Sequence, residues 1–121
     1  MSNLLLLCLG GAALLGLYLG TLYLRGTPKP TLSLVHGFLA FSGLAVLIVA
    51  IRGNPYIPND PQPSRLGTVA AAFLAWALFS GLVGPLYREK SKRGREAILI
   101  SHAAAGLTGL AVVVLWLSRQ P

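Results

Sequence analysis

Two histidines stand in the same local setting within apolar parts of the chain. His36 opens the stretch HGFLAFSGLAV and His102 opens HAAAGLTGLAV, at an offset of 66 residues. Both stretches fit the pattern H-x5-[ST]-G-L-A-V. Histidine is costly in hydrocarbon, and ionisable side chains inside membrane segments commonly mark functional sites. The repeated setting therefore predicts that the two imidazoles share one task.

Small residues follow each histidine along one helical stripe. The positions four and seven residues further on hold only alanine or glycine, namely Ala40, Gly43, Gly106 and Gly109. If two helices bring the histidines face to face, we expect these positions to form a flat-walled slot beginning at the imidazoles. Haem iron accepts two axial imidazoles, and a planar macrocycle between them needs such a slot. The pattern therefore predicts one b-type haem per chain, with His36 and His102 as its iron ligands.

Basic residues lie just before both histidine segments, where the propionates of such a haem would end. Lys29 precedes the first segment, and Arg93 and Arg95 precede the second. Hydrogen bonds between cationic side chains and carboxylates are among the strong ones in proteins. We therefore expect these three residues to pair with the propionates.

Four long apolar runs must position these residues. The chain is 55% hydrophobic and only 11% charged, whereas soluble domains carry about 25% charged residues. A helix needs about 20 apolar residues to cross the hydrocarbon core of a bilayer. The runs predict helices over residues 4–24, 32–51, 66–87 and 97–117. We therefore expect an all-α, integral membrane four-helix bundle that forms a single transmembrane domain over residues 1–121.

The helices before the two histidine segments also end alike, with Leu-Tyr at residues 22–23 and 86–87. Together with the 66-residue offset, this predicts two parallel-repeat helical hairpins related by an axis along the membrane normal. Each histidine lies six or seven residues after the basic loop before it, which is about 9–11 Å at 1.5 Å rise per residue. We therefore expect the two imidazoles at nearly equal depth on the second and fourth helices.

Lysine and arginine are distributed unequally between the two ends of the bundle. Loops 25–31 and 88–96 hold seven of them, and the opposite end holds three. Because cytoplasmic loops carry the excess of basic residues, we expect both loops in the cytoplasm and both termini outside. The protein would be multi-pass in a bacterial inner membrane or its equivalent. The net charge of +7 suits contact with anionic headgroups, and nucleic acid is not expected as a partner.

The motifs HGFLAFSG and HAAAGLTG resemble those of four-helix membrane cytochromes of b type. In these proteins facing helices supply the axial histidines, and glycines pack on the porphyrin. The resemblance covers the second and fourth helices and implies electron transfer with a quinol or a redox partner subunit. Larger b-type cytochromes generally hold two haems on four histidines. The two histidines of this chain permit at most one bis-histidine haem.

Other interpretations stay open at this point. Both histidines could be hydrogen-bonding struts in a cofactor-free structural or accessory subunit of a membrane complex, or the haem could serve sensing or carriage. A proton relay would need an intramembrane carboxylate, but all three acidic residues lie in or beside loops. A divalent metal would need a third ligand, and Cys8 lies near the opposite end of the bundle. The sequence does not decide whether the protein is an enzyme.

Overall fold

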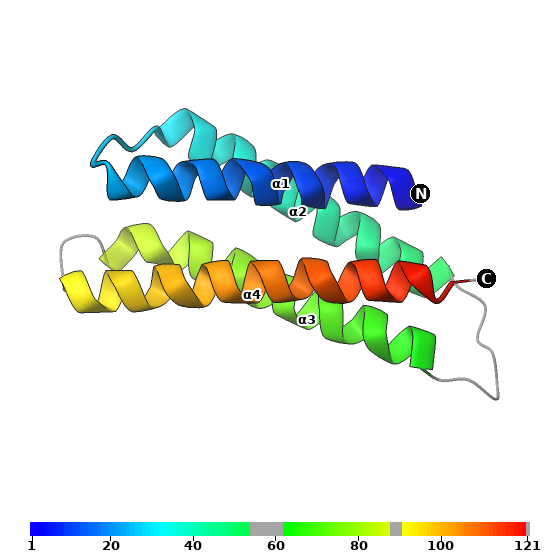
Figure 1. The fold of residues 1–121 in the computed structure, drawn as a ribbon. Helices are drawn as coiled ribbons and strands as arrows, with labels where there is room; N and C mark the ends of the chain where they lie inside the picture. Colours follow the sequence, from blue (N-terminus) through cyan, green and yellow to red (C-terminus); the bar gives the residue numbers. More distant parts are fainter. Residues whose placement is uncertain (54–61, 88–90, 121) are drawn as a thin grey trace.

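Helices make up nearly all of the part of the chain that the computed structural model describes, which is residues 1–53, 62–87 and 91–120. These residues contain no strand, so the all-helical prediction is confirmed. Figure 1 shows α1 (Ser2–Leu24), α2 (Pro30–Gly53), α3 (Gln62–Val83), the short 3₁₀ helix η1 (Gly84–Tyr87) and α4 (Lys92–Ser118). The acidic residues Asp60 and Glu89 and the basic residues Arg88 and Lys90 lie outside the described residues.

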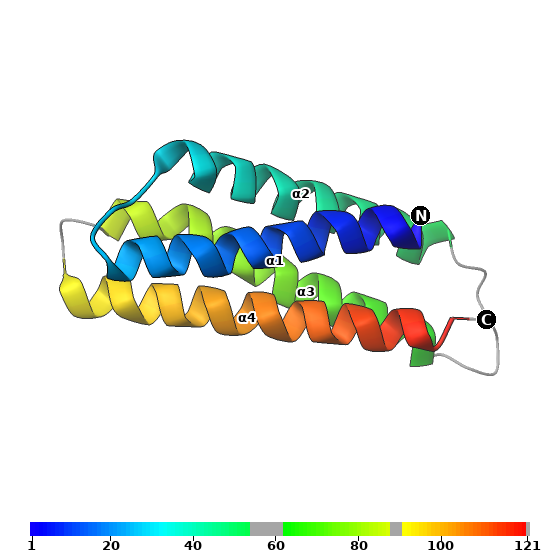
Figure 2. The same ribbon diagram turned by 45° about the horizontal axis from the view of Figure 1, so that its top comes forward.

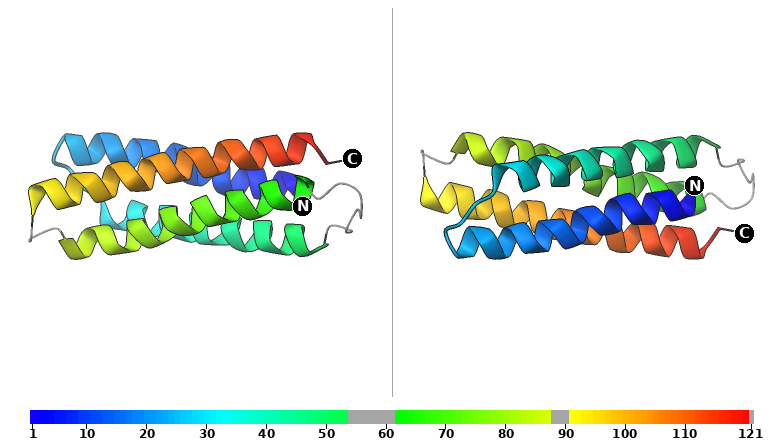
Figure 3. Two further views of the ribbon diagram at one scale, coloured as in Figure 1. Left: turned by 90° about the horizontal axis from the view of Figure 1, so that it is seen from below. Right: turned by 90° about the horizontal axis from the view of Figure 1, so that it is seen from above.

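The four α-helices lie side by side with their long axes roughly aligned (Figures 1 and 2). Each helix packs against the next, and α4 returns to contact α1. Packing is closest within the hairpins α1–α2 and α3–α4. Among the described residues α2 and α4 make no backbone approach, so they lie diagonally across the bundle. Figure 3 shows from two sides that both termini lie at one end, opposite the α1–α2 connection.

All four helices are long and apolar enough to cross a membrane. A helix of 22 residues is about 33 Å long, and the hydrocarbon core of a bilayer is about 30 Å thick. The outward faces carry large apolar side chains such as Leu7 and Phe38, which are 72% and 71% exposed. Water would oppose such a surface, whereas lipid solvates it. The helices therefore suggest a multi-pass membrane protein in a lipid environment.

The helix ends differ in places from the predicted bounds. The fourth helix begins at Lys92, five residues before the predicted start, because the Ser91 side chain caps it by accepting the N–H of Gly94 at 3.2 Å. Part of the predicted loop 88–96 is therefore the first turn of α4. The third span changes from α-helix to 3₁₀ helix at Gly84, next to Pro85, whose missing N–H breaks the α-helical hydrogen bonding.

The turn after α1 has a defined geometry. Gly26 has a φ of 72°, which glycine adopts without steric cost. Its N–H donates to the carbonyl of Tyr23 at 3.0 Å, and the N–H of Thr27 donates to that of Leu22 at 2.9 Å. These two bonds form the Schellman motif, which satisfies the last carbonyls of a helix. The motif ends α1 and starts the connection to α2.

The large buried side chains gather in the half of the bundle that holds the termini. All four helices contribute to this core cluster, which comprises Leu5, Leu9, Leu47, Ala70, Val113 and Trp116. Beyond it, toward the α1–α2 connection, the buried residues in the described part are mostly small: Ala12, Ala77, Ser80 and Ala105, with Leu22 the one large exception. The tight apolar core and the histidine segments therefore occupy different halves of the bundle.

Both hairpins are closed by a glycine that lies against a leucine. A Cβ placed on Gly43 of α2 would lie 2.8 Å from Leu9 Cγ, and one placed on Gly109 of α4 would lie 2.8 Å from Leu74 Cγ. Only glycine permits such an approach, as is common where membrane helices pack closely. The glycines stand at an offset of 66 residues and the leucines at 65. This recurrence supports the predicted repeat, although the duplication itself stays a prediction.

We expect Gly109→Ala to lower the stability of the α3–α4 hairpin. Its methyl group would meet Leu74 Cγ at 2.8 Å and the backbone N of Leu74 at 3.3 Å, and overpacking of this kind typically costs about 1–3 kcal/mol. The measurement is the unfolding midpoint in SDS, compared with that of Gly37→Ala, where an added Cβ meets nothing within 4 Å. Equal midpoints for the two variants would contradict the close packing at Gly109.

Candidate functional site

The side chains of His36 and His102 meet in the interior of the bundle. Their ring centroids are 5.8 Å apart, and the ring planes make an angle of 74°, so the rings meet edge to face. His36 belongs to α2 and His102 to α4, the two helices that lie on a diagonal. The contact therefore crosses the centre of the bundle. Both side chains are partly buried.

Each ring is held by a backbone carbonyl of the other helix in its hairpin. Nδ1 of His36 lies 2.8 Å from the carbonyl oxygen of Ala12, and Nδ1 of His102 lies 2.7 Å from that of Ala77. A carbonyl oxygen only accepts hydrogen bonds, so each Nδ1 carries a proton and donates it. The neutral ring then keeps a lone pair on Nε2. Within the described residues neither Nε2 has a hydrogen-bond partner.

This arrangement is the one that prepares histidine to bind a metal. Histidine ligands characteristically donate the N–H of one ring nitrogen to a carbonyl or carboxylate, which fixes the tautomer and orients the other nitrogen toward the metal. A metal–imidazole bond of about 2 Å on each side would separate two ring centroids by about 6 Å. The observed 5.8 Å is close to that spacing. Two imidazoles held in this way suit the axial positions of one shared metal ion.

Other protein ligands are not assembled around this pair. The described residues contain no group of three or more His, Cys, Asp or Glu side chains placed to hold a metal ion. A structural zinc site is almost always four-coordinate. A centre built on these two histidines would therefore need most of its ligand atoms from a source other than protein side chains.

A glycine on the neighbouring helix borders each ring, and the sequence analysis did not assign either glycine to the site. A Cβ placed on Gly16 of α1 would lie 2.9 Å from Cε1 of His36, and one placed on Gly81 of α3 would lie 2.9 Å from Cε1 of His102. The detectable signal is the pattern Leu-x2-Ala-x3-Gly, which occurs at residues 9–16 and 74–81. It becomes visible only when α1 and α3 are aligned at an offset of 65 residues rather than 66.

The small residues predicted to line a slot between α2 and α4 contact the hairpin partners instead. Gly43 and Gly109 lie against leucines of α1 and α3, and Gly106 lies 3.8 Å from Cβ of Ala77 through an added Cβ. Ala40 is partly buried on α2. The stripe that carries each histidine thus faces the first helix of its own hairpin. Only the long imidazole side chain reaches from that stripe to the centre.

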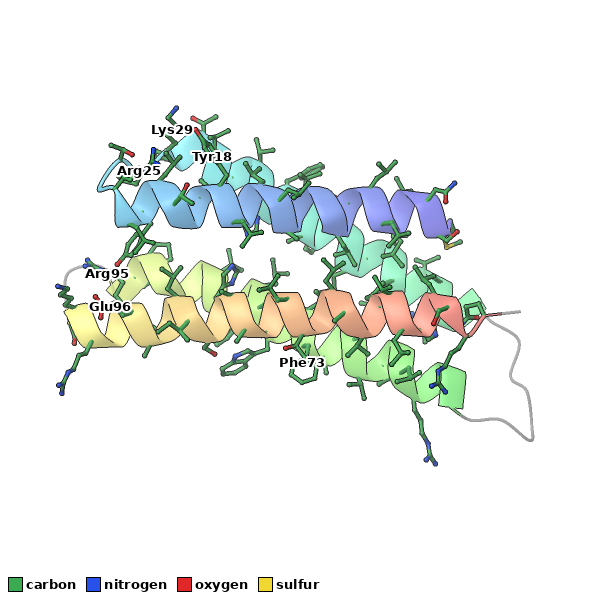
Figure 4. All side chains as sticks on the ribbon, viewed as in Figure 1. Tyr18, Arg25, Lys29, Phe73, Arg95 and Glu96 are labelled. Carbon is green, nitrogen blue, oxygen red and sulfur yellow. The ribbon has the colours of Figure 1, made fainter. Side chains whose placement is uncertain are left out.

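The predicted basic residues lie at the end of the bundle nearer the histidines. Figure 4 shows Arg25, Lys29 and Arg95 at this end. The guanidinium of Arg95 lies over the ring of Tyr23, 5.6 Å from its centroid, which is a cation–π contact between α4 and α1. Lys29 and Arg93 are exposed. These groups surround the entrance to the bundle interior, and their pairing with propionates stays a prediction.

No protein-family model, curated protein or solved structure shows significant similarity to this chain. The interpretation of the site therefore rests on its own geometry.

We expect both histidines to be neutral Nδ1–H tautomers in the haem-free protein, because each Nδ1 donates to a carbonyl. The measurement is ¹⁵N NMR of protein labelled at histidine in detergent micelles at neutral pH. Both residues should show a protonated Nδ1 and an unprotonated Nε2. His36→Ala and His102→Ala assign the two signals. An Nε2–H tautomer at either residue would contradict the hydrogen bond to Ala12 or to Ala77.

Proposed function

We propose that this protein is a membrane-embedded b-type haem protein that holds one haem between His36 and His102 and serves electron transfer. The observation that carries the proposal is the pair of Nδ1–H hydrogen bonds to helix carbonyls, which leaves Nε2 as the ligand nitrogen on two adjacent rings. A porphyrin supplies four nitrogen ligands itself and needs only two from the protein. The donor set of this bundle matches that need.

The interior at the level of the histidines supports the same proposal. Buried residues here are mostly small, such as Ala77, Ser80 and Ala105, whereas the large apolar side chains lie in the other half of the bundle. A porphyrin is wide and flat, so a half without bulky buried side chains suits it better than a filled core. The haem would supply one-electron redox chemistry when bound.

The residues of this chain would divide the remaining tasks. His36 and His102 hold the iron, the carbonyls of Ala12 and Ala77 orient the imidazoles, and the apolar helices exclude water. Lys29, Arg93 and Arg95 pair with the propionates at the basic end. Ala40, Gly43, Gly106 and Gly109 keep the helices that carry the histidines close to α1 and α3. The two hairpins would be parallel repeats with both termini outside the cell.

A single haem in this place limits where electrons can go. The histidines lie about 10 Å inside the basic end of the bundle, which leaves roughly 20 Å of a 30 Å hydrocarbon core on the other side. The described residues offer no second pair of histidines to bridge that distance. We therefore propose exchange with a quinol in the bilayer or with a redox partner subunit on the basic, cytoplasmic side.

One observation favours a second function, that of a cofactor-free structural subunit. The two rings are in direct edge-to-face contact, and each is bonded to its own hairpin. Such a contact would join the two hairpins as a strut without any cofactor. The aromatic contact is worth about 0.5–1.5 kcal/mol beyond the area that it buries.

We expect the purified protein to show the spectrum of a low-spin, six-coordinate haem. Replacing either axial ligand, in His36→Ala or His102→Ala, should abolish this spectrum, because the iron then keeps only one protein ligand. Gly37→Ala, beside His36 in open space, is the matched control and should keep full haem content. A colourless protein from haem-replete cells that also takes up no added hemin would favour the structural subunit.

We expect the termini outside the cell and the basic end in the cytoplasm, because basic residues are in excess at that end. Cys8 is the only cysteine, so Cys8→Ser provides a background for Ser91→Cys and Ser118→Cys. An impermeant maleimide should label position 118 in intact cells and position 91 only after permeabilisation. Labelling of position 91 in intact cells would reverse the proposed orientation.

A further inference from the structure

We infer that Gly16 and Gly81 are positioning residues that fix the planes of the two imidazoles and hold these planes nearly perpendicular. Neither glycine would touch the iron. Each would act through the histidine that lies on it. The part of this inference that concerns the bound haem rests on the function proposed above.

The first step is access to a helix carbonyl. In an α-helix each Cα–Cβ bond tilts toward the N-terminus, so a side chain covers the turn that precedes it. A side chain at position 16 would cover the carbonyl of Ala12, four residues earlier, and one at position 81 would cover that of Ala77. Glycine leaves both carbonyls open. Each can then accept the Nδ1–H of a histidine, at 2.8 Å and 2.7 Å, in addition to its bond within the helix.

The second step is the space beside the ring. A Cβ on Gly16 would lie 2.9 Å from Cε1 and 3.4 Å from Nδ1 of His36. A Cβ on Gly81 would lie 2.9 Å from Cε1 and 3.0 Å from Nδ1 of His102. Carbon atoms pack at about 3.5–4.0 Å, so a methyl group at either position must turn the imidazole or break its hydrogen bond. Each ring is thus fixed at two points, the carbonyl and the open face of the glycine.

The third step links the ring planes to the haem. The two rings make an angle of 74°, and each plane is set by its own hairpin. In a low-spin ferric haem the relative orientation of two axial imidazole planes sets the splitting of the iron d orbitals, and nearly perpendicular planes give a strongly anisotropic EPR signal. A hydrogen bond from Nδ1–H also raises the basicity of the ligand. This bond stabilises the ferric state and lowers the reduction potential.

The test compares Gly16→Ala, Gly81→Ala and the double variant with Gly20→Ala. Gly20 lies one turn beyond Gly16 on α1, and an added Cβ there meets nothing within 4 Å. The wild type and Gly20→Ala should show the same strongly anisotropic ferric EPR signal and the same midpoint potential. Gly16→Ala and Gly81→Ala should stay low-spin but show a less anisotropic signal and a higher potential. The double variant should show the larger change in both.

Two outcomes would overturn the inference while the proposed function stands. One is haem-loaded Gly16→Ala and Gly81→Ala with the EPR signal and potential of Gly20→Ala. The other is a wild-type signal typical of nearly parallel imidazole planes, which requires no variant to fold. The unfolding midpoint of every variant shows whether a change reflects the ring or the whole bundle.

A readout without haem separates failure of the inference from failure of the function. In the haem-free protein, ¹⁵N NMR should show that Gly16→Ala weakens the Nδ1–H signal of His36 alone and Gly81→Ala that of His102 alone. If the wild type binds no haem but these selective changes occur, the proposed function is wrong and the positioning of the rings stands. If neither variant affects its histidine more than Gly20→Ala does, the positioning is wrong.

Discussion

The site depends on how an imidazole N–H finds an acceptor inside hydrocarbon. A buried polar group without a partner costs several kcal/mol, and the carbonyls of a helix are already bonded and largely covered by side chains. The two carbonyls that His36 and His102 use are open because glycine follows four residues later on the same helix. Once these bonds form, the tautomer, the ring plane and the meeting of the rings at the centre follow.

The bundle separates the task of staying folded from the task of presenting two imidazoles. Large side chains interlock in the half that holds the termini, where Leu5, Leu47 and Val113 are fully or almost fully buried. The other half is held by glycine contacts, by the histidine bonds and by the contact of Arg95 with Tyr23. Because apolar packing is concentrated away from the histidines, their surroundings can be small without loss of the core.

The sequence allowed the helices and the histidine pair to be predicted, but not the rotation of each helix. Long apolar runs locate membrane helices reliably because the bilayer sets their length. Rotation is different, since lipid and protein interior are equally apolar and no hydrophobic stripe marks the inner face. Gly43 and Gly109 were therefore placed in a slot between α2 and α4 rather than against Leu9 and Leu74. Gly16 and Gly81 escaped notice because a single-residue shift separates the alignment of α1 with α3 from that of the histidines.

The early start of α4 at Lys92 has an electrostatic consequence. The N-terminus of a helix carries a partial positive charge from its aligned peptide dipoles, and each cation placed there is disfavoured by about 0.3–1 kcal/mol at low ionic strength. The first turn of α4 holds Lys92, Arg93 and Arg95 and no acidic residue. Anionic phosphate groups at the membrane surface would neutralise this repulsion. The length of α4 is thus tied to the lipid composition of the leaflet that it meets, and the turn unwinds most readily among zwitterionic lipids.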